Sequence, residues 1–148
     1  MRVLIDTNIL LDYFAQRGAF FEPAHRLLLA CMEKKIKGYI AAHSVLNTFY
    51  ILRHSHTPEQ RRNVLRDMCR FLQVVSVDKG KVLAALNDYS CSDFEDCVQA
   101  QCASACRANV IITRNVKDFA AASIPAISPD EFCRRFLAAE EGAGGHSQ

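Results

Sequence analysis

The feature that most constrains the fold is the alternation of short apolar segments with longer helical ones. The segments with the length and composition of buried strands are 2–5, 39–42, 73–77, 110–112 and 124–127. Between them, apolar spacing and helix-start signals predict helices near residue 9, over 22–36, 44–53, 58–71, 78–86 and 92–107, and from 129 onward. This alternation predicts an α/β fold in which helices cover both faces of a parallel sheet of four to five strands.

The composition fits one folded domain. The chain has 148 residues, half of them hydrophobic, which is enough to build a core. We expect a domain over residues 1–140 and a flexible, Gly-rich tail over 141–148. No apolar run approaches the roughly 18 residues that span a bilayer, and an aspartate interrupts the N-terminal run too early for a signal peptide. We therefore expect a cytoplasmic protein with no membrane partner. A net charge of +2 neither indicates nor excludes a nucleic-acid ligand.

The seven cysteines are expected to be reduced thiols, because the chain shows no export signal. Most would act as small buried hydrophobic residues. A zinc site is disfavoured, because the chain has no CxxC pair and no matching group of histidines.

Polar side chains follow the first and fourth predicted strands at the point where each strand ends. These are Asp6, Thr7 and Asn8 after the first strand, and Thr113, Arg114 and Asn115 after the fourth, with Asp118 just beyond. In open parallel sheets, ligand sites form beyond the carboxyl ends of the strands. The sequence therefore predicts that both groups contribute to one site.

Two further carboxylates come from a predicted helix start. Asp93 and Asp96 are one turn apart at the beginning of the helix over 92–107, so they share a helix face. Several carboxylates beside one sheet edge can hold Mg²⁺ or Mn²⁺, with water completing the coordination. Such an ion orients and activates a water and stabilises a phosphodiester during in-line attack. Asp6, Asp96 and Asp118 together are thus the candidate catalytic residues.

Each of these residues also has an ordinary structural interpretation. Asp6 and Asn8 could cap the following helix, and Asp93 could complement a helix dipole. Asp118 could begin a solvated turn. His25 and His43 are expected to be structural, because no serine or cysteine pairs with them in the pattern of a nucleophilic triad.

Four motifs together resemble the PIN domain family: LIDTNILLD, SDFEDCVQA, IITRNVKDF and IPAISPDEF. They are most similar to a bacterial branch with a DFED helix and a TRN-x-x-DF segment. The resemblance runs from Met1 to about Phe136. It implies a Rossmann-like three-layer α/β/α fold and a metal-dependent ribonuclease. Many bacterial members are toxins of toxin–antitoxin pairs and dimers are common, so it also implies an antitoxin partner and a homodimer.

The motifs assign roles to individual residues. Asp6 matches the first acidic ligand of the family, Asp96 the acid inside the DFED helix, and Asp118 the last acid. Thr113 and Asn115 match the polar residues beside that last acid. Thr7 and Asn8 are expected to shape the turn after the first strand and to orient the neighbouring carboxylate or a metal-bound water.

Asn47 departs from the pattern of the family. Toxin-type members usually carry a glutamate in the helix after the second strand, and Asn47 is its nearest equivalent here. An amide oxygen can bind a hard cation but brings no charge. Three consequences are open: weaker metal binding, compensation by Asp93 or Glu95, or impaired catalysis. An ordinary surface position for Asn47 is equally consistent with the sequence.

The helix predicted after Thr57 carries a possible RNA contact. Arg62, Arg66 and Arg70 follow i, i+4 spacing and form one basic stripe, which could track phosphates. A solvated face is the more usual role of such residues. The sequence therefore favours a metal-dependent ribonuclease, with a catalytically degraded RNA- or protein-binding module of the same fold as the alternative. A phosphatase-like enzyme is less favoured, because no aspartate nucleophile is followed by a second aspartate two residues on.

Overall fold

The structure is a computed structural model, and it describes residues 1–137. The predicted domain end at 140 and the predicted tail over 141–148 lie outside the described residues. The strands are β1 (Arg2–Ile5), β2 (Lys37–Ala41), β3 (Leu72–Val75), β4 (Val110–Ile112) and β5 (Ala126–Ile127). The α-helices are α1 (Thr7–Phe14), α2 (Phe21–Met32), α3 (Ala42–Ile51), α4 (Pro58–Met68), α5 (Lys79–Leu86), α6 (Phe94–Ala105) and α7 (Pro129–Phe132). Short helical turns are η1 (Gly18–Phe20), η2 (Leu52–His54), η3 (Val116–Phe119) and η4 (Cys133–Leu137).

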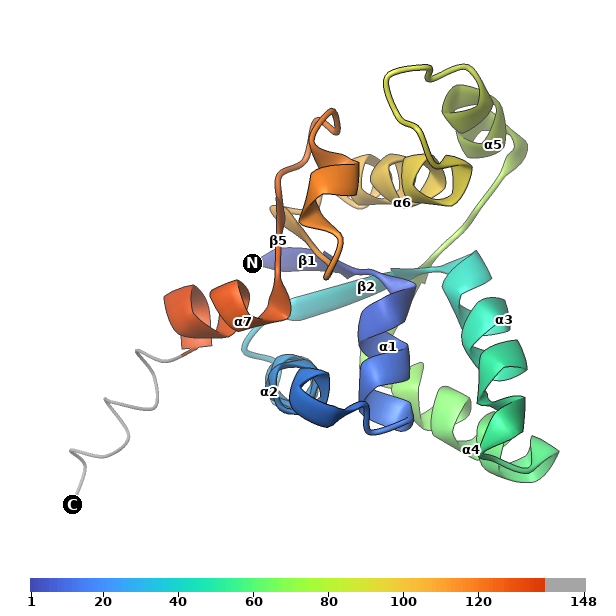
Figure 1. Ribbon diagram of the computed structural model, residues 1–148, viewed down its shortest axis with the longest axis vertical. Helices are drawn as coiled ribbons and strands as arrows, with labels where there is room; N and C mark the ends of the chain where they lie inside the picture. The colour runs from blue at the N-terminus through green and yellow to red at the C-terminus, as the bar shows by residue number, and fades with distance from the viewer. Residues whose placement is uncertain (138–148) are drawn as a thin grey trace.

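The five strands form one parallel sheet in the order β3-β2-β1-β4-β5. The predicted α/β fold with a parallel sheet is therefore confirmed. Because β1 lies at the centre, its carboxyl end is flanked by the ends of β2 and β4, and the chain order reverses at this point (Figure 1). A strand order that reverses in this way leaves a crevice at the carboxyl ends of the central strands.

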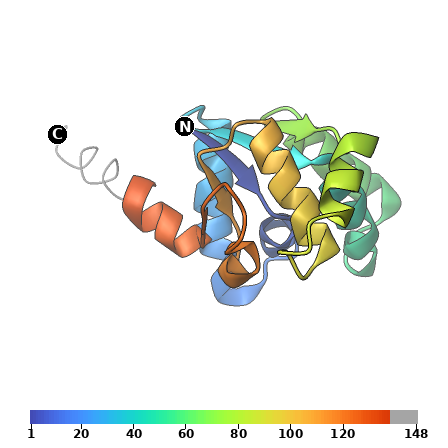
Figure 2. The same cartoon turned by 90° about the horizontal axis from the view of Figure 1, so that it is seen from above.

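The sheet separates two layers of helices. In Figure 1, α5 and α6 cover one face, while α1, α2, α3 and α4 lie on the other. Alternate residues of one strand accordingly join different clusters: Val3 and Ile5 pack with α1 and α2, whereas Leu4 packs with α6. Seen from above in Figure 2, α7 lies beside α2 at one side of the molecule. This is the three-layer arrangement that the sequence predicted.

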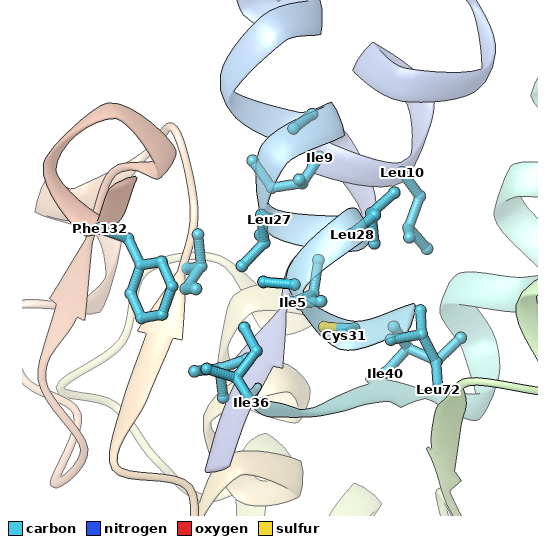
Figure 3. Packing of buried hydrophobic residues seen from close by; sticks show 14 of the residues in the cluster. Ile5, Ile9, Leu10, Leu27, Leu28, Cys31, Ile36, Ile40, Leu72 and Phe132 are labelled. Carbon is cyan, nitrogen blue, oxygen red and sulfur yellow. The ribbon is translucent and has the colours of Figure 1, made fainter. Parts of the chain in front are cut away.

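The larger core lies beneath α1 and α2. Figure 3 shows Ile9, Leu10, Leu27 and Leu28 directed toward the sheet, and Phe132 closing one end of the cluster. The side chains labelled in Figure 3 that are fully buried are each worth about 2 kcal/mol of burial. This packed layer fixes the position of β1 and therefore of the residues that follow it.

Gly38 in β2 is required by close packing rather than by backbone conformation. A Cβ atom placed at this position would lie 2.5 Å from Leu72 Cδ2 and 2.7 Å from Cys31 Sγ. The absence of a side chain thus lets α2 approach the sheet closely at this position.

Helix ends follow the capping chemistry of the sequence in most places. Thr57 caps α4 in a full capping box with Gln60, and Ser128 caps α7. The predicted helix over 22–36 was too long, because α2 ends at Met32 and the chain turns through Lys34 at a φ of 61°. Within residues 1–137, no helix is both long and apolar enough to cross a membrane.

Candidate functional site

Asp6 lies at the centre of the candidate site, immediately after β1. Its backbone N–H donates to the Ile112 carbonyl (3.0 Å), which ties it to the end of β4. Its carboxylate accepts hydrogen bonds from the Thr7 N–H (2.7 Å) and from Thr113 Oγ1 (2.8 Å). Asp6 is therefore the cap of α1, as one interpretation of the sequence predicted, and its carboxylate is held in a fixed orientation, while its role as a metal ligand stays a prediction.

The start of α6 supplies three more carboxylates. Asp93 caps the helix by accepting from the Asp96 N–H (3.0 Å), and α6 begins two residues later than the predicted start at residue 92. Carboxylate oxygens of Asp93, Glu95 and Asp96 lie within 4.8 Å of one another. Asp96 is buried and Asp93 is exposed. Among residues 1–137, this is the only group of three or more histidine, cysteine, aspartate or glutamate side chains whose ligand atoms all lie within 4.8 Å of one another, and Asp6 is not part of it.

Glu95 is held by a network between α3 and α6. Its Oε1 is 2.8 Å from His43 Nε2 and accepts a hydrogen bond from Gln99 Nε2 (3.0 Å). Gln99 Nε2 also lies 3.0 Å from Ser44 Oγ, which in turn accepts from Thr7 Oγ1 (2.7 Å). The network joins the start of α1 to the starts of α3 and α6.

These elements enclose a cleft of about 290 Å³. Its lining residues are Asp6, Thr7, Asn8, Leu11, Asn47, Tyr50, Ile51, Glu95, Asp96 and Asn115. One polar atom of the wall, Asn8 Oδ1, is buried and accepts no hydrogen bond from any described residue. An acceptor oxygen in this state is suited to a cation or to a water bound to one.

The clustering of carboxylates changes how they ionise. Burial raises the pKa of Asp6 from 3.8 to about 6, although the Thr113 hydroxyl opposes the change. Burial, followed by the charges of Asp93, Asp6 and Glu95, raises the pKa of Asp96 from 3.8 to about 7. Burial acts in the same direction on Glu95, but hydrogen bonds from His43 and Gln99 outweigh it and hold its pKa below the usual value. A divalent cation would relieve this crowding of negative charge.

The donor set fits a hard divalent cation. Asp6, Glu95 and Asp96 offer carboxylate oxygens, Asn8 and Asn47 offer amide oxygens, and the cleft has room for water. Oxygen ligands of this kind suit Mg²⁺ and Mn²⁺ and do not suit softer metals that prefer sulfur or imidazole.

The structure brings together most of the residues that the sequence singled out. Asp6, Thr7, Asn8, Asn47, Asp96 and Asn115 line the cleft, Thr113 holds Asp6 from below, and Asp93 caps the helix that carries Asp96. Asp118 differs: it is exposed on η3 and does not line the cleft, although its charge contributes to the raised pKa of Asp96. Glu95, which the sequence named only as one of two residues that could compensate for Asn47, lines the cleft, and its partner His43, expected to be structural, contacts it there.

The basic stripe lies apart from the cleft lining. Arg62, Arg66 and Arg70 are exposed on α4 or at its end, and none of them lines the cleft. Arg70 lines a different pocket, together with Met1 and Lys34. An RNA contact through this stripe stays a prediction.

A buried ion pair supports the loop after β4. Both carboxylate oxygens of Asp12 accept from Arg114, at 2.7 and 3.2 Å, and Asp12 is 1% exposed. The guanidinium carbon of Arg114 lies 4.3 Å from the centre of the Phe20 ring. This pair joins α1 to the segment that carries Thr113 and Asn115, and it accounts for the charge that the sequence places inside α1.

The expectation that every cysteine is a reduced thiol is wrong for one pair. Cys91 and Cys97 form a disulfide with a Cα–Cα distance of 5.9 Å. It closes the short segment that contains Asp93, Glu95 and Asp96. Spacing alone could not reveal this pair, because the start of the helix brings two residues six apart in sequence to bonding distance. Cys31, Cys69, Cys102, Cys106 and Cys133 remain thiols.

Comparisons with known proteins agree with this architecture. A family model for the PIN domain matches residues 2–117, and the chain belongs to this family. Among curated protein sequences none matches. Several solved structures share the fold. VapBC-1 from nontypeable Haemophilus influenzae has a TM-score of 0.66 at 16% identity, covering 88% of this chain and 99% of that one.

A toxin–antitoxin complex from Klebsiella pneumoniae has a TM-score of 0.63 at 23% identity, covering 86% of this chain and 97% of that chain. VapC20 from Mycobacterium tuberculosis, a toxin that cleaves the sarcin–ricin loop, has a TM-score of 0.62 at 14% identity, covering 82% and 95%. At these identities, the likeness shows the fold that the chains share.

Proposed function

We propose that this protein is a ribonuclease that depends on Mg²⁺ or Mn²⁺ and hydrolyses RNA phosphodiesters without a covalent enzyme intermediate. The observation that carries the proposal is the cleft whose lining brings together buried Asp6 and Asp96, a third carboxylate, Glu95, and Asn8, whose buried acceptor oxygen has no hydrogen-bond partner among the described residues. Membership of the PIN domain family and the likeness to an RNA-cleaving toxin support the same assignment.

The residues of the chain would divide the work as follows. Asp96 and Glu95 would hold the cation together with Asp6, which lines the same cleft, and Asp93 and Asp118 would add negative charge nearby. When bound, Mg²⁺ or Mn²⁺ supplies Lewis-acid chemistry that favours deprotonation of water and offsets the charge of a phosphodiester.

The polar groups around the carboxylates would position them and the substrate. The Thr7 N–H and the Thr113 hydroxyl each donate to one oxygen of Asp6. The lone pairs that remain on these oxygens therefore have a fixed orientation. Asn115 lines the cleft, and its amide group can donate a hydrogen bond to a phosphate oxygen. Arg62, Arg66 and Arg70 would add attraction for the RNA backbone, with a corresponding dependence on salt.

We also propose that the protein acts as the toxin of a toxin–antitoxin pair. The support is the likeness to VapBC-1 and to the Klebsiella toxin–antitoxin complex. Leu46 and Tyr50 of α3 are 69% and 62% exposed, and Tyr50 lines the cleft, so an antitoxin segment could cover both and block the site. A homodimer is proposed from membership of the PIN domain family, in which dimers are common, and light scattering that shows only monomer at micromolar and higher concentrations would contradict it.

A second candidate function is an RNA- or protein-binding module that does not cleave. The observation in its favour is Asn47, because α3 presents a neutral amide rather than a carboxylate to the cleft. Such a module would retain RNA binding but would show no cleavage under any metal condition.

A cleavage assay with matched variants separates the two functions. Wild-type protein should cleave a fluorescently labelled RNA with excess Mn²⁺, and a chelator should stop the reaction. Asp96→Asn should reduce cleavage to background, whereas Asp130→Asn, which changes an exposed aspartate on α7, should not. Cleavage by Asp96→Asn at the wild-type rate would contradict the ribonuclease proposal, and RNA binding without cleavage by wild type would establish the binding module.

A further inference from the structure

The two walls of the cleft differ in charge. The wall from α3 presents Asn47 and Tyr50, which are neutral, whereas the wall from α6 presents Glu95 and Asp96. The remaining carboxylate, Asp6, has one hydrogen bond on each oxygen. A divalent cation in this cleft would therefore draw most of its compensating charge from the start of α6.

Glu95 is placed too specifically for an ordinary surface glutamate in a first helical turn. His43 Nε2 and Gln99 Nε2 both meet its Oε1, and Gln99 is fully buried. These contacts direct the carboxylate toward Asp96 and Asp93, to within 4.8 Å. Like charges at this separation repel each other. A His43–Glu95 contact whose only role was to join α3 to α6 would be more stable at a position away from Asp93 and Asp96.

We propose that Glu95 is a direct ligand of the divalent cation and that His43 is the residue that positions it. The inference rests on the proposed function, since it concerns the same cleft. It assigns the third carboxylate to α6 and gives His43 a role in metal affinity beyond its contribution to stability. Groups around a metal ligand typically contribute about ten- to a hundredfold to affinity by orienting that ligand.

The test is Mn²⁺ binding, measured by calorimetry and by the electron paramagnetic resonance signal of free Mn²⁺, at pH 8 without RNA. Glu95→Gln should weaken binding by about tenfold or more, because the variant retains the shape of the side chain but loses the charge. Its amide can still meet His43 and Gln99, so the fold should persist. Glu22→Gln, on the exposed start of α2, is the matched control and should bind as wild type does.

The role of His43 is tested by a double-mutant cycle that combines substitutions of His43 and Glu95. His43→Ala should weaken Mn²⁺ binding by about tenfold in the wild-type background and should have little further effect when Glu95 is already glutamine. His43→Gln, which can still donate to Glu95, should recover most of the affinity. An effect of His43→Ala that is equally large in both backgrounds would overturn the positioning role.

A double variant that regains Mn²⁺ binding would exclude unfolding as the reason for weak binding by Glu95→Gln. Adding Asn47→Glu to Glu95→Gln places a carboxylate on the opposite wall of the same cleft and should restore Mn²⁺ affinity. If Asp96→Asn abolishes Mn²⁺ binding while Glu95→Gln leaves it unchanged, the inference fails and the proposed metal dependence stands. If wild-type protein binds no Mn²⁺, the proposed metal dependence itself fails.

Discussion

Asp6→Asn should make the metal-free protein more stable at pH 8, even though it removes a residue of the proposed active site. The substitution keeps the size of the side chain. Thr7 N–H can still donate to the new carbonyl oxygen, and the Thr113 hydroxyl can accept from the new amide group, so the local hydrogen bonds can be kept. What changes is the charge buried at the end of β1.

The magnitude follows from the pKa of Asp6, which burial raises from 3.8 to about 6. The folded state then holds the proton more tightly than the unfolded state, so this group stabilises the fold most below pH 3.8. The contribution is lost as the pH rises through about 6. A shift of about two pKa units corresponds to about 3 kcal/mol at 1.36 kcal/mol per unit. Asp96, with its pKa raised to about 7, changes stability in the same direction.

The assay is urea unfolding followed by circular dichroism, in the presence of a chelator, at pH 4.5 and pH 8. Wild-type protein should lose more stability than Asp6→Asn between the two conditions, by about 2 kcal/mol, because pH 4.5 already lies above the unfolded pKa of 3.8 and only about 1.5 pKa units remain below the folded value of about 6. Excess Mn²⁺ at pH 8 should stabilise wild type and have less effect on the variant. Parallel pH profiles for wild type and Asp6→Asn would refute the reasoning, and Asp130→Asn is the control that should follow wild type.

Further predictions concern the supports of the site. Thr113→Val should weaken Mn²⁺ binding by about tenfold, because Asp6 loses a hydrogen bond that orients it; unchanged affinity in a calorimetric titration would contradict this. Cys91→Ser should lower the free energy of unfolding by about 2 kcal/mol, as expected for a short disulfide loop, and reductant should have no further effect on the variant in urea unfolding. Asp12→Asn should cost about 3 kcal/mol, because it leaves Arg114 beside a neutral partner, and thermal unfolding within 1 °C of wild type would refute it.

Much of the fold could be predicted from local signals in the sequence. Parallel strands are buried on both faces, so they read as short apolar runs, and the helices between them begin with recognisable caps at Thr57, Asp78 and Ser128. Boundaries were less predictable where a backbone turn overrides side-chain spacing. Apolar spacing continues to Ile36, but the positive φ at Lys34 ends α2 four residues earlier, at Met32.

The candidate site also contains residues that could be predicted from the sequence and residues that could not. Asp6 and Asp96 could be predicted from position. Asp6 directly follows a strand and Asp96 lies at the start of a helix, and in a parallel α/β fold both positions lie at the carboxyl edge of the sheet. The sequence offered Glu95 only as an alternative to Asp93 and could not choose between them, because the orientation of Glu95 depends on His43, which is 52 residues away along the chain. Asp118 matches the last acid of the family motif, but it is exposed on η3, the short helical turn that follows Asn115. Long-range side-chain contacts therefore decide which acids line the cleft.

The energetics of the cleft bear on the choice between an enzyme and a binding module. Asp6 and Asp96 are buried carboxylates with a raised pKa, so in the absence of a cation they reduce the stability of the fold at neutral pH. A module that only binds RNA gains nothing from them, because negative charge repels phosphate. Replacing them with neutral residues would both stabilise such a module and strengthen its ligand contact. A site that holds Mg²⁺ or Mn²⁺ has the opposite requirement, because the cation offsets the repulsion between the carboxylates and becomes the contact for phosphate. The neutral Asn47 then changes how the charge is distributed between the walls of the cleft, and the acids of α6 keep the site suited to a metal.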